Sequence, residues 1–126
     1  MGTIVNERIV DYINSLDKGN SPVCNAIEKE ALADGVPIIR KEMQSFLKLL
    51  LAMQKPMRIL EVGTAVGFSA LCMREYLPKS SHITTIEKVE MRLKEARKNL
   101  ERLDEDDRIT LLEGDAIEVL KELLIK

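Results

Sequence analysis

The stretch RILEVGTAVGFSAL, residues 58–71, limits the possible folds of this chain more than any other. It has the pattern of a buried strand, a turn marked by Gly63 and Gly67, and then a helix. Glycine lets a ligand approach the backbone closely, and the free N–H groups at a helix start favour an anion. Because α/β proteins build the floor of a nucleotide pocket in this way, the stretch predicts a nucleotide-like ligand.

Strand and helix patterns alternate three times after Pro56. The second predicted helix is the most regular, because its apolar residues recur at steps of four, three, four and three. Alternation with short connections predicts an α/β fold with a parallel sheet and right-handed crossovers. The expected strands are residues 57–62, 82–88 and 108–114, and the expected helices are residues 68–77, 89–103 and a last helix opened by Asp115.

The first half of the chain has helical patterns instead. An apolar stripe formed by Val5, Ile9, Ile13 and Leu16 predicts a first helix. Ser21 and Pro22 predict the N-cap and the first helical position of a second helix. A third helix is expected over residues 40–54. Because no linker or repeat interrupts the chain, we expect one domain over 1–126, with a helical cover at 1–55 and a βαβαβα half at 56–126.

Composition narrows the possible partners. The net charge of −2 leaves no basic footprint of the kind that nucleic-acid binders show, which favours a small-molecule partner. Cys24 and Cys72 are expected to be buried free thiols, and the charged residues near the N-terminus exclude a signal peptide or membrane span there. We therefore expect a soluble, cytoplasmic protein without a membrane partner, and a solvated acidic turn at residues 104–107.

An acidic residue lies at or next to the carboxyl end of each of the three predicted strands, and parallel sheets bind ligands at these ends. Glu61 ends the first strand, and Ser69 in the following helix has a hydroxyl that suits a carboxylate, unless it is only a surface residue. Glu87 ends the second strand, where it suits the two hydroxyls of a ribose or a helix cap. Asp115 suits the N-cap of the last helix, an adenine slot beside Ala116, or both.

The form of the glycine turn separates possible cofactors. Ala65 stands where a dinucleotide fingerprint has its second glycine, which disfavours a nicotinamide dinucleotide. Glu61 would repel a pyrophosphate but suits a ligand with a cationic group. Together with Glu87 and Asp115, these features favour an adenosine ligand with an amino acid tail and a positive sulfur.

Three segments, ILEVGTAVGFSAL, TTIEKVEMRLKEARKNL and ITLLEGDAIEVL, together resemble the class I S-adenosylmethionine-dependent methyltransferases. With the preceding GVPIIRKEMQSFLKLL, the chain is similar to the cation-dependent O-methyltransferases, related to catechol and caffeoyl-CoA methyltransferases, and to their bacterial branch that includes tRNA 5-hydroxyuridine methyltransferases. The resemblance implies a Rossmann-like parallel sheet with strands 1 to 3 present and an N-terminal helical cover. It also implies methyl transfer to a hydroxyl of a catechol-like small molecule or of 5-hydroxyuridine in tRNA.

The same resemblance implies which residues bind S-adenosylmethionine. Residues near the first strand would hold the methionine part, with Ile39 closing over it, and residues at the next two strand ends would hold the ribose and the adenine. The cofactor-binding residues implied in this way are Ile39, Glu61, Gly63, Thr64, Gly67, Ser69, Glu87, Asp115 and Ala116.

The family's metal ligands have no counterpart in this sequence, so the ligands of the Mg²⁺ that the resemblance implies are expected beyond Lys126. We therefore expect no catalytic or metal-binding residue here and no activity of the chain alone. Since the first strand would keep an apolar edge, a fragment, a truncated product or a swapped homo-oligomer is expected. A non-catalytic S-adenosylmethionine-binding or oligomerisation module is the alternative, and the methyl acceptor stays open.

Overall fold

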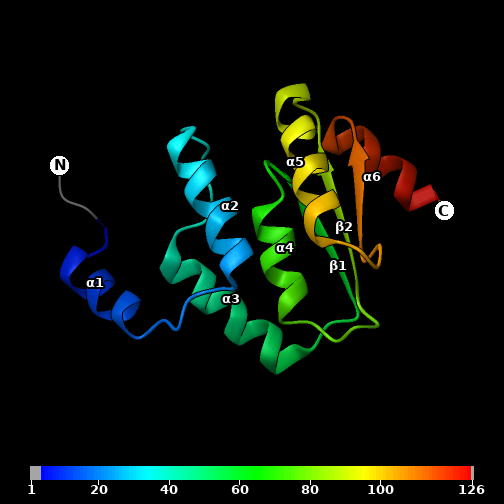
Figure 1. Ribbon diagram of the computed structural model, residues 1–126. Helices are drawn as coiled ribbons and strands as arrows, with labels where there is room; N and C mark the ends of the chain where they lie inside the picture. Colours follow the sequence, from blue (N-terminus) through cyan, green and yellow to red (C-terminus); the bar gives the residue numbers. More distant parts are fainter. Residues whose placement is uncertain (1–3, 126) are drawn as a thin grey trace.

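A computed structural model describes residues 4–125, which form a three-stranded parallel sheet and six helices (Figure 1). The predicted α/β class and parallel sheet are therefore confirmed. The strands lie in the order β1-β2-β3, so each strand pairs with the next along the chain. The elements are α1 (Glu7–Ser15), α2 (Pro22–Ala33), α3 (Lys41–Gln54), β1 (Arg58–Val62), α4 (Phe68–Glu75), β2 (His82–Glu87), α5 (Glu90–Leu103), β3 (Ile109–Glu113) and α6 (Ala116–Ile125).

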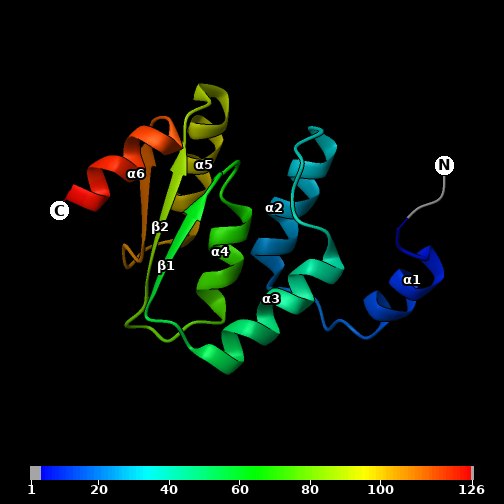
Figure 2. The ribbon, with the colours of Figure 1, turned by 180° about the vertical axis from the view of Figure 1, so that it is seen from behind.

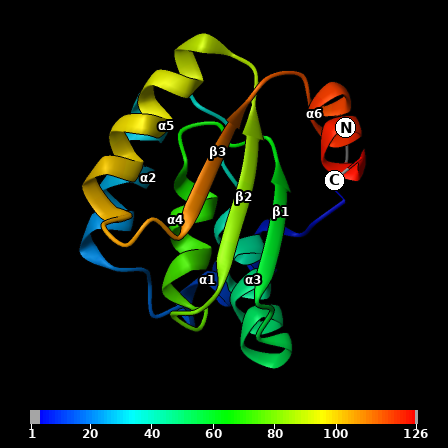
Figure 3. The same cartoon turned by 90° about the vertical axis from the view of Figure 1, so that its right-hand side faces the viewer.

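The sheet separates α4 and α5 on one face from α6 on the other (Figures 1 and 3). The register aligns Ile59 with Ile83 and Ile83 with Ile109, so one row of isoleucines points toward α4 and α5. Phe68 and Leu71 of α4 are buried against this side of the sheet in the main hydrophobic core. The alternation of side chains along the strands thus produces the core that supports the following helices.

The N-terminal helices form a further layer beyond α4, with α1 outermost (Figure 2). Helix α2 begins as predicted: Ser21 is its N-cap, its Oγ accepts a hydrogen bond from the backbone N–H of Cys24 at 3.2 Å, and Pro22 is the first helical residue. Cys24 and Cys72 are buried free thiols, as expected. Burial raises the pKa of Cys24 to about 12 and that of Cys72 to about 11.

A buried amide joins α3 to the segment that precedes it. Gln44 is 1% exposed, and its Nε2 donates to the carbonyl of Ile39 at 2.9 Å and to Oε2 of Glu28 at 2.7 Å. The Oε1 of Gln44 accepts from Asn20 at 3.1 Å. Because Gln44 is satisfied on both sides, the backbone at Ile39 is held against the start of α3.

The expectation of a solvated acidic turn at residues 104–107 is wrong for Asp104, which is 9% exposed. Its Oδ1 accepts from Arg74 Nε at 2.9 Å and from the backbone N–H of Arg108 at 3.0 Å, and its Oδ2 accepts from the N–H of Ile109 at 2.8 Å. Asp104 therefore connects the end of α5 to the start of β3. The sequence did not reveal this role, because two of the partners are backbone N–H groups and the third, Arg74, lies 30 residues earlier in the chain.

Apolar side chains remain exposed at several places, among them α1 and the outer strand β1. The predicted stripe on α1 lies in a helix whose one buried residue is Val10, and Ile9 in that stripe is exposed. Within residues 4–125, β1 pairs with β2 alone, and its Leu60 and Val62 are 52% and 58% exposed. No helix in this described part is long and apolar enough to cross a lipid bilayer.

Candidate functional site

Two adjoining cavities lie at the carboxyl ends of the strands. The strand-end cavity, of about 180 Å³, is lined by residues that follow all three strands, and the turn cavity, of about 90 Å³, lies between the glycine turn and residues 37–39. Gly63 lines both. Seven of the nine predicted cofactor residues line one or both cavities: Ile39, Gly63, Thr64, Ser69, Glu87, Asp115 and Ala116.

The glycine turn between β1 and α4 is held by the end of β2. The N–H groups of Gly63 and Thr64 both donate to the carbonyl of Ile86, at 2.9 and 3.1 Å. Gly67 is the N-cap of α4 and has φ +87°, a left-handed conformation that glycine adopts without strain. The turn therefore presents the first N–H groups of α4 beside the turn cavity, an arrangement that suits an anionic group.

Glu87 contacts both the glycine turn and the two residues that precede α5. Its Oε2 accepts from the backbone N–H of Ala65 at 2.9 Å, and its Oε1 accepts from the N–H groups of Lys88 and Val89 at 3.2 Å each. Lys88 and Val89 both precede Glu90, the first residue of α5, so Glu87 bonds no helical N–H group and the capping alternative is not observed. The carboxylate also lines the strand-end cavity. A carboxylate has about four lone-pair sites, so these three bonds leave capacity for a further donor.

Glu61 lines neither of the two cavities but lies beneath the turn. Ser69 donates its hydroxyl to Oε2 of Glu61, and Thr85 donates to Oε1 at 2.6 Å. Burial raises the pKa of Glu61, and the two hydroxyl hydrogen bonds act in the opposite direction. The carboxylate thus acts here as the acceptor for a pair of hydroxyls. The expectation that Glu61 lines the methionine part of a cofactor stays a prediction.

Thr85 is a site residue that sequence reasoning missed. It stands directly opposite Glu61 in the parallel register of β1 and β2 and is fully buried. In the sequence it belongs to a run of β-branched residues that indicates only a strand. Its position two residues before Glu87 was the available signal, because alternate residues of a strand share one face.

Asp115, which follows β3, both caps α6 and lines the strand-end cavity. Asp115 Oδ1 accepts from the N–H of Ile117 at 3.0 Å, so the predicted N-cap role at the start of α6 is confirmed. Lys88 Nζ lies 3.6 Å from Asp115 Oδ2, and both are exposed. Ala116 lines the strand-end cavity beside Asp115. That Asp115 and Ala116 bind an adenine stays a prediction.

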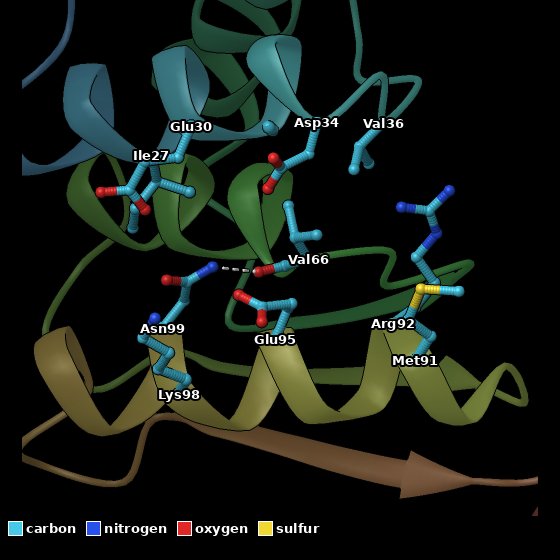
Figure 4. Close-up of a pocket in the computed structure, with 11 residues that line it drawn as sticks. Ile27, Glu30, Asp34, Val36, Val66, Met91, Arg92, Glu95, Lys98 and Asn99 are labelled. Atoms are coloured by element: carbon cyan, nitrogen blue, oxygen red, sulfur yellow. Dashed lines mark hydrogen bonds between the residues drawn. The ribbon is translucent and has the colours of Figure 1, made fainter.

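A third and larger cavity, of about 380 Å³, lies behind the turn, between α2 and α5 (Figure 4). None of the predicted cofactor residues lines it. Val66 belongs to both this cavity and the turn cavity, and Asn99 of α5 donates to the Val66 carbonyl at 2.8 Å. Helix α5 therefore supports the glycine turn from behind.

The Mg²⁺ that the family resemblance implies does not fit the part of the chain that the structure describes. Residues 4–125 contain no group of three or more His, Cys, Asp and Glu side chains placed to hold a metal ion. We therefore assign no metal ligand and derive no reaction step through a metal.

Comparison of the sequence with known proteins identifies similar O-methyltransferases. A family model described as O-methyltransferase matches residues 24–126. The chain is 28% identical to a catechol O-methyltransferase of Niastella koreensis, over 98% of this chain and 57% of that protein. It is 30% identical to a protein-L-isoaspartate O-methyltransferase of Methanothermobacter thermautotrophicus, over 67% of this chain and 38% of that protein. The chain thus spans about half, or less, of the length of these relatives.

Solved structures show the same fold. A methyltransferase from Geobacter sulfurreducens superposes with a TM-score of 0.79 at 26% identity, covering 93% of this chain and 62% of that one. The O-methyltransferase from Bacillus cereus, solved in complex with SAH, superposes with a TM-score of 0.80 at 24% identity, covering 94% and 55%. The sheet and its helices match class I methyltransferases, and since the family model covers most of the sequence, this chain belongs to the O-methyltransferase family.

Proposed function

We propose that this chain binds S-adenosylmethionine and forms the cofactor-binding portion of an O-methyltransferase. The observation that carries the proposal is the joined pair of cavities at the strand ends, lined by seven residues that the family resemblance implies for this cofactor. The Bacillus cereus structure with SAH, which has the same fold, supports the same ligand class.

In this proposal the ligand lies along the strand ends. Glu87 accepts a hydrogen bond from the ribose at its remaining acceptor site, and Asp115 with Ala116 flanks the adenine. The methionine carboxylate lies beside Ser69 and the first N–H groups of α4, and Ile39 covers it. Since Ser69 donates its only hydroxyl hydrogen to Glu61 in the structure, this hydroxyl must turn to reach the ligand.

When bound, the cofactor supplies a methyl group on a positively charged sulfur, which an acceptor oxygen attacks. Two acceptor classes are proposed, a catechol-like small molecule and 5-hydroxyuridine in tRNA. The net charge of −2 favours the small molecule, because it is not the basic excess that RNA binders usually carry. The similarity to a catechol O-methyltransferase over 98% of this chain supports the same choice.

A non-catalytic S-adenosylmethionine-binding or oligomerisation module is the second candidate. The exposed apolar edge at β1 favours it, because such an edge pairs readily with another strand. Transfer of a labelled methyl group to a catechol by the purified chain would exclude this candidate.

Calorimetric titration with S-adenosylhomocysteine tests the proposed function. Wild type is expected to bind it in preference to NAD. Glu87→Ala is expected to weaken binding at least tenfold, since hydrogen bonds to a charged group are lost. Glu113→Ala is the matched control, because Glu113 pairs with Glu87 in the register but lies outside both cavities. Unchanged affinity in Glu87→Ala would refute the site assignment, and preference for NAD would refute the cofactor.

A further inference from the structure

The hydroxyl of Thr85 is bonded on both sides in the middle of the sheet. It donates to Glu61 Oε1 at 2.6 Å and lies 2.7 Å from Thr64 Oγ1. A hydroxyl has a single hydrogen, so Thr85 must accept from Thr64 while it donates to Glu61. The hydrogen bonds therefore run in one direction, from Thr64 through Thr85 to Glu61.

The two ends of this hydrogen-bond chain differ in what a ligand can reach. Thr64 and Ser69 line the turn cavity, whereas Thr85 and Glu61 do not. Ser69 is the other hydroxyl donor to Glu61. A ligand carboxylate that takes the Ser69 hydrogen withdraws it from Glu61, because Ser69 cannot donate to both. Thr85 is fully buried, so its donation to Glu61 stays in place when a ligand binds.

A partly buried carboxylate needs such a donor. Burial disfavours the charged form and raises the pKa of Glu61, and hydrogen bonds from hydroxyls oppose that change. If both donors were lost, the side chain would take up a proton or move away from the turn. Loss of the Thr85 hydroxyl would also remove the partner that β2 provides for the Thr64 hydroxyl at the wall of the turn cavity.

We propose that Thr85 is a positioning residue of the cofactor pocket, which anchors the Glu61 carboxylate and the Thr64 hydroxyl while Ser69 is engaged with the carboxylate of the ligand. This role rests on the proposed function. It does not make Thr85 a catalytic residue, because Thr85 lines neither cavity.

Two ligands separate this role from a general structural one. S-adenosylhomocysteine has the amino acid tail that reaches Ser69, whereas methylthioadenosine has the same adenosine and sulfur without the tail. Thr85→Val keeps the shape of the side chain and removes its hydroxyl. It is expected to weaken S-adenosylhomocysteine binding about tenfold and to leave methylthioadenosine binding unchanged, since only the first ligand draws on Ser69.

Two further comparisons keep the test independent of folding defects. Thr85→Ser and Thr85→Ala both lack the methyl group and differ in the hydroxyl, so Thr85→Ser is expected to bind S-adenosylhomocysteine more tightly than Thr85→Ala. This pair replaces Thr85→Val if that variant does not fold. Thr84→Val is the matched control, because Thr84 lies next along β2 with its side chain on the opposite face, and it is expected to bind as wild type does.

The outcomes are distinct. Wild-type affinity in Thr85→Val, or equal affinity in Thr85→Ser and Thr85→Ala, would overturn the positioning role and leave the proposed function standing. Equal weakening of both ligands in Thr85→Val would also overturn it, in favour of general damage to the sheet. Failure of wild type to bind S-adenosylhomocysteine would overturn the proposed function itself, together with the role that rests on it.

Discussion

Asn99 on α5 donates its side-chain amide to the backbone carbonyl of Val66, at 2.8 Å, in the turn between β1 and α4. Asn99 Oδ1 accepts from Arg102 at 3.4 Å, and Arg102 also lies 3.3 Å from Glu30 on α2. A line of polar contacts thus runs from α2 through α5 to the turn that lines the candidate site, and Figure 4 shows its last contact, between Asn99 and Val66.

Removal of this amide should destabilise the protein. Asn99→Ala leaves the Val66 carbonyl without its donor in a buried place, which costs about 1–3 kcal/mol. Lys98→Ala, at an exposed neighbouring position on the same helix, is expected to change the free energy of unfolding by less than about 0.5 kcal/mol. Urea denaturation measures both. Equal midpoints for the two variants would show that the turn does not depend on Asn99.

Asp104 is expected to be the most sensitive residue of the acidic turn. Asp104→Ala removes the acceptor of two backbone N–H groups and of Arg74, and the expected loss of stability is roughly 2–4 kcal/mol. Glu105→Ala, next to it and exposed, should stay within about 0.5 kcal/mol of wild type. Thermal unfolding of the two variants distinguishes the residues, and a similar small effect in both would contradict the connecting role of Asp104.

The stability that Asp17 contributes should depend on pH. Ser45 donates to its carboxylate at 2.5 Å, Gly19 N–H donates at 2.6 Å, and Lys48 lies 3.6 Å away. The Ser45 hydroxyl is the largest cause that holds the pKa of Asp17 below its ordinary value of 3.8, with Gly19 and Lys48 acting in the same direction against burial. The native state therefore binds fewer protons than the unfolded state near this pKa, so the contribution is present above it and disappears as the pH falls.

Asp17→Asn is the variant that measures this dependence. Wild type should be more stable by about 1 kcal/mol at neutral pH, and the difference should close in acid, below pH 3.8. Urea denaturation of both proteins over a series of pH values gives the difference directly. If the difference in the free energy of unfolding between wild type and Asp17→Asn stayed constant across the series, packing and not the charge of Asp17 would be the source of the stabilisation.

The exposed edge at β1 predicts self-association of the purified chain. Leu60 is half exposed on β1, which has no strand on its other side within residues 4–125. Leu60→Lys places a charge on this edge, and such charges discourage strand pairing. Sedimentation is expected to show concentration-dependent dimers for wild type and mainly monomers for Leu60→Lys, with Thr110→Lys on β3 as an exposed control that keeps the dimer. A monomeric wild type at all concentrations would contradict the homo-oligomer.

The location of the candidate site at the strand ends was predictable, because all the strands of a parallel sheet end on the same side. Once the alternation of strands and helices is recognised, the acidic residues are expected at the carboxyl ends of neighbouring strands. In the structure Glu87 and Asp115 line one cavity there, whereas Glu61 lies outside both cavities. The caps at Ser21 and Asp115 were predictable for a similar reason, since each bonds to an N–H two or three residues ahead.

The residues that sequence reasoning missed make their contacts at long range. Thr85 bonds across the register to Glu61, and Asn99 bonds to a backbone carbonyl 33 residues away, so neither contact leaves a periodic signal. The stripe on α1 shows a different limit. Periodicity identifies which face of a helix is apolar, but it does not say whether another element covers that face, and Ile9 is exposed.

The pairing of each strand with the next along the chain has a consequence for how the site arises. All the residues of the strand-end cavity lie between Val62 and Ala116 in one unbroken stretch. The cavity can therefore assemble in the order of synthesis, one βα unit after another, without waiting for a distant segment to return to the sheet.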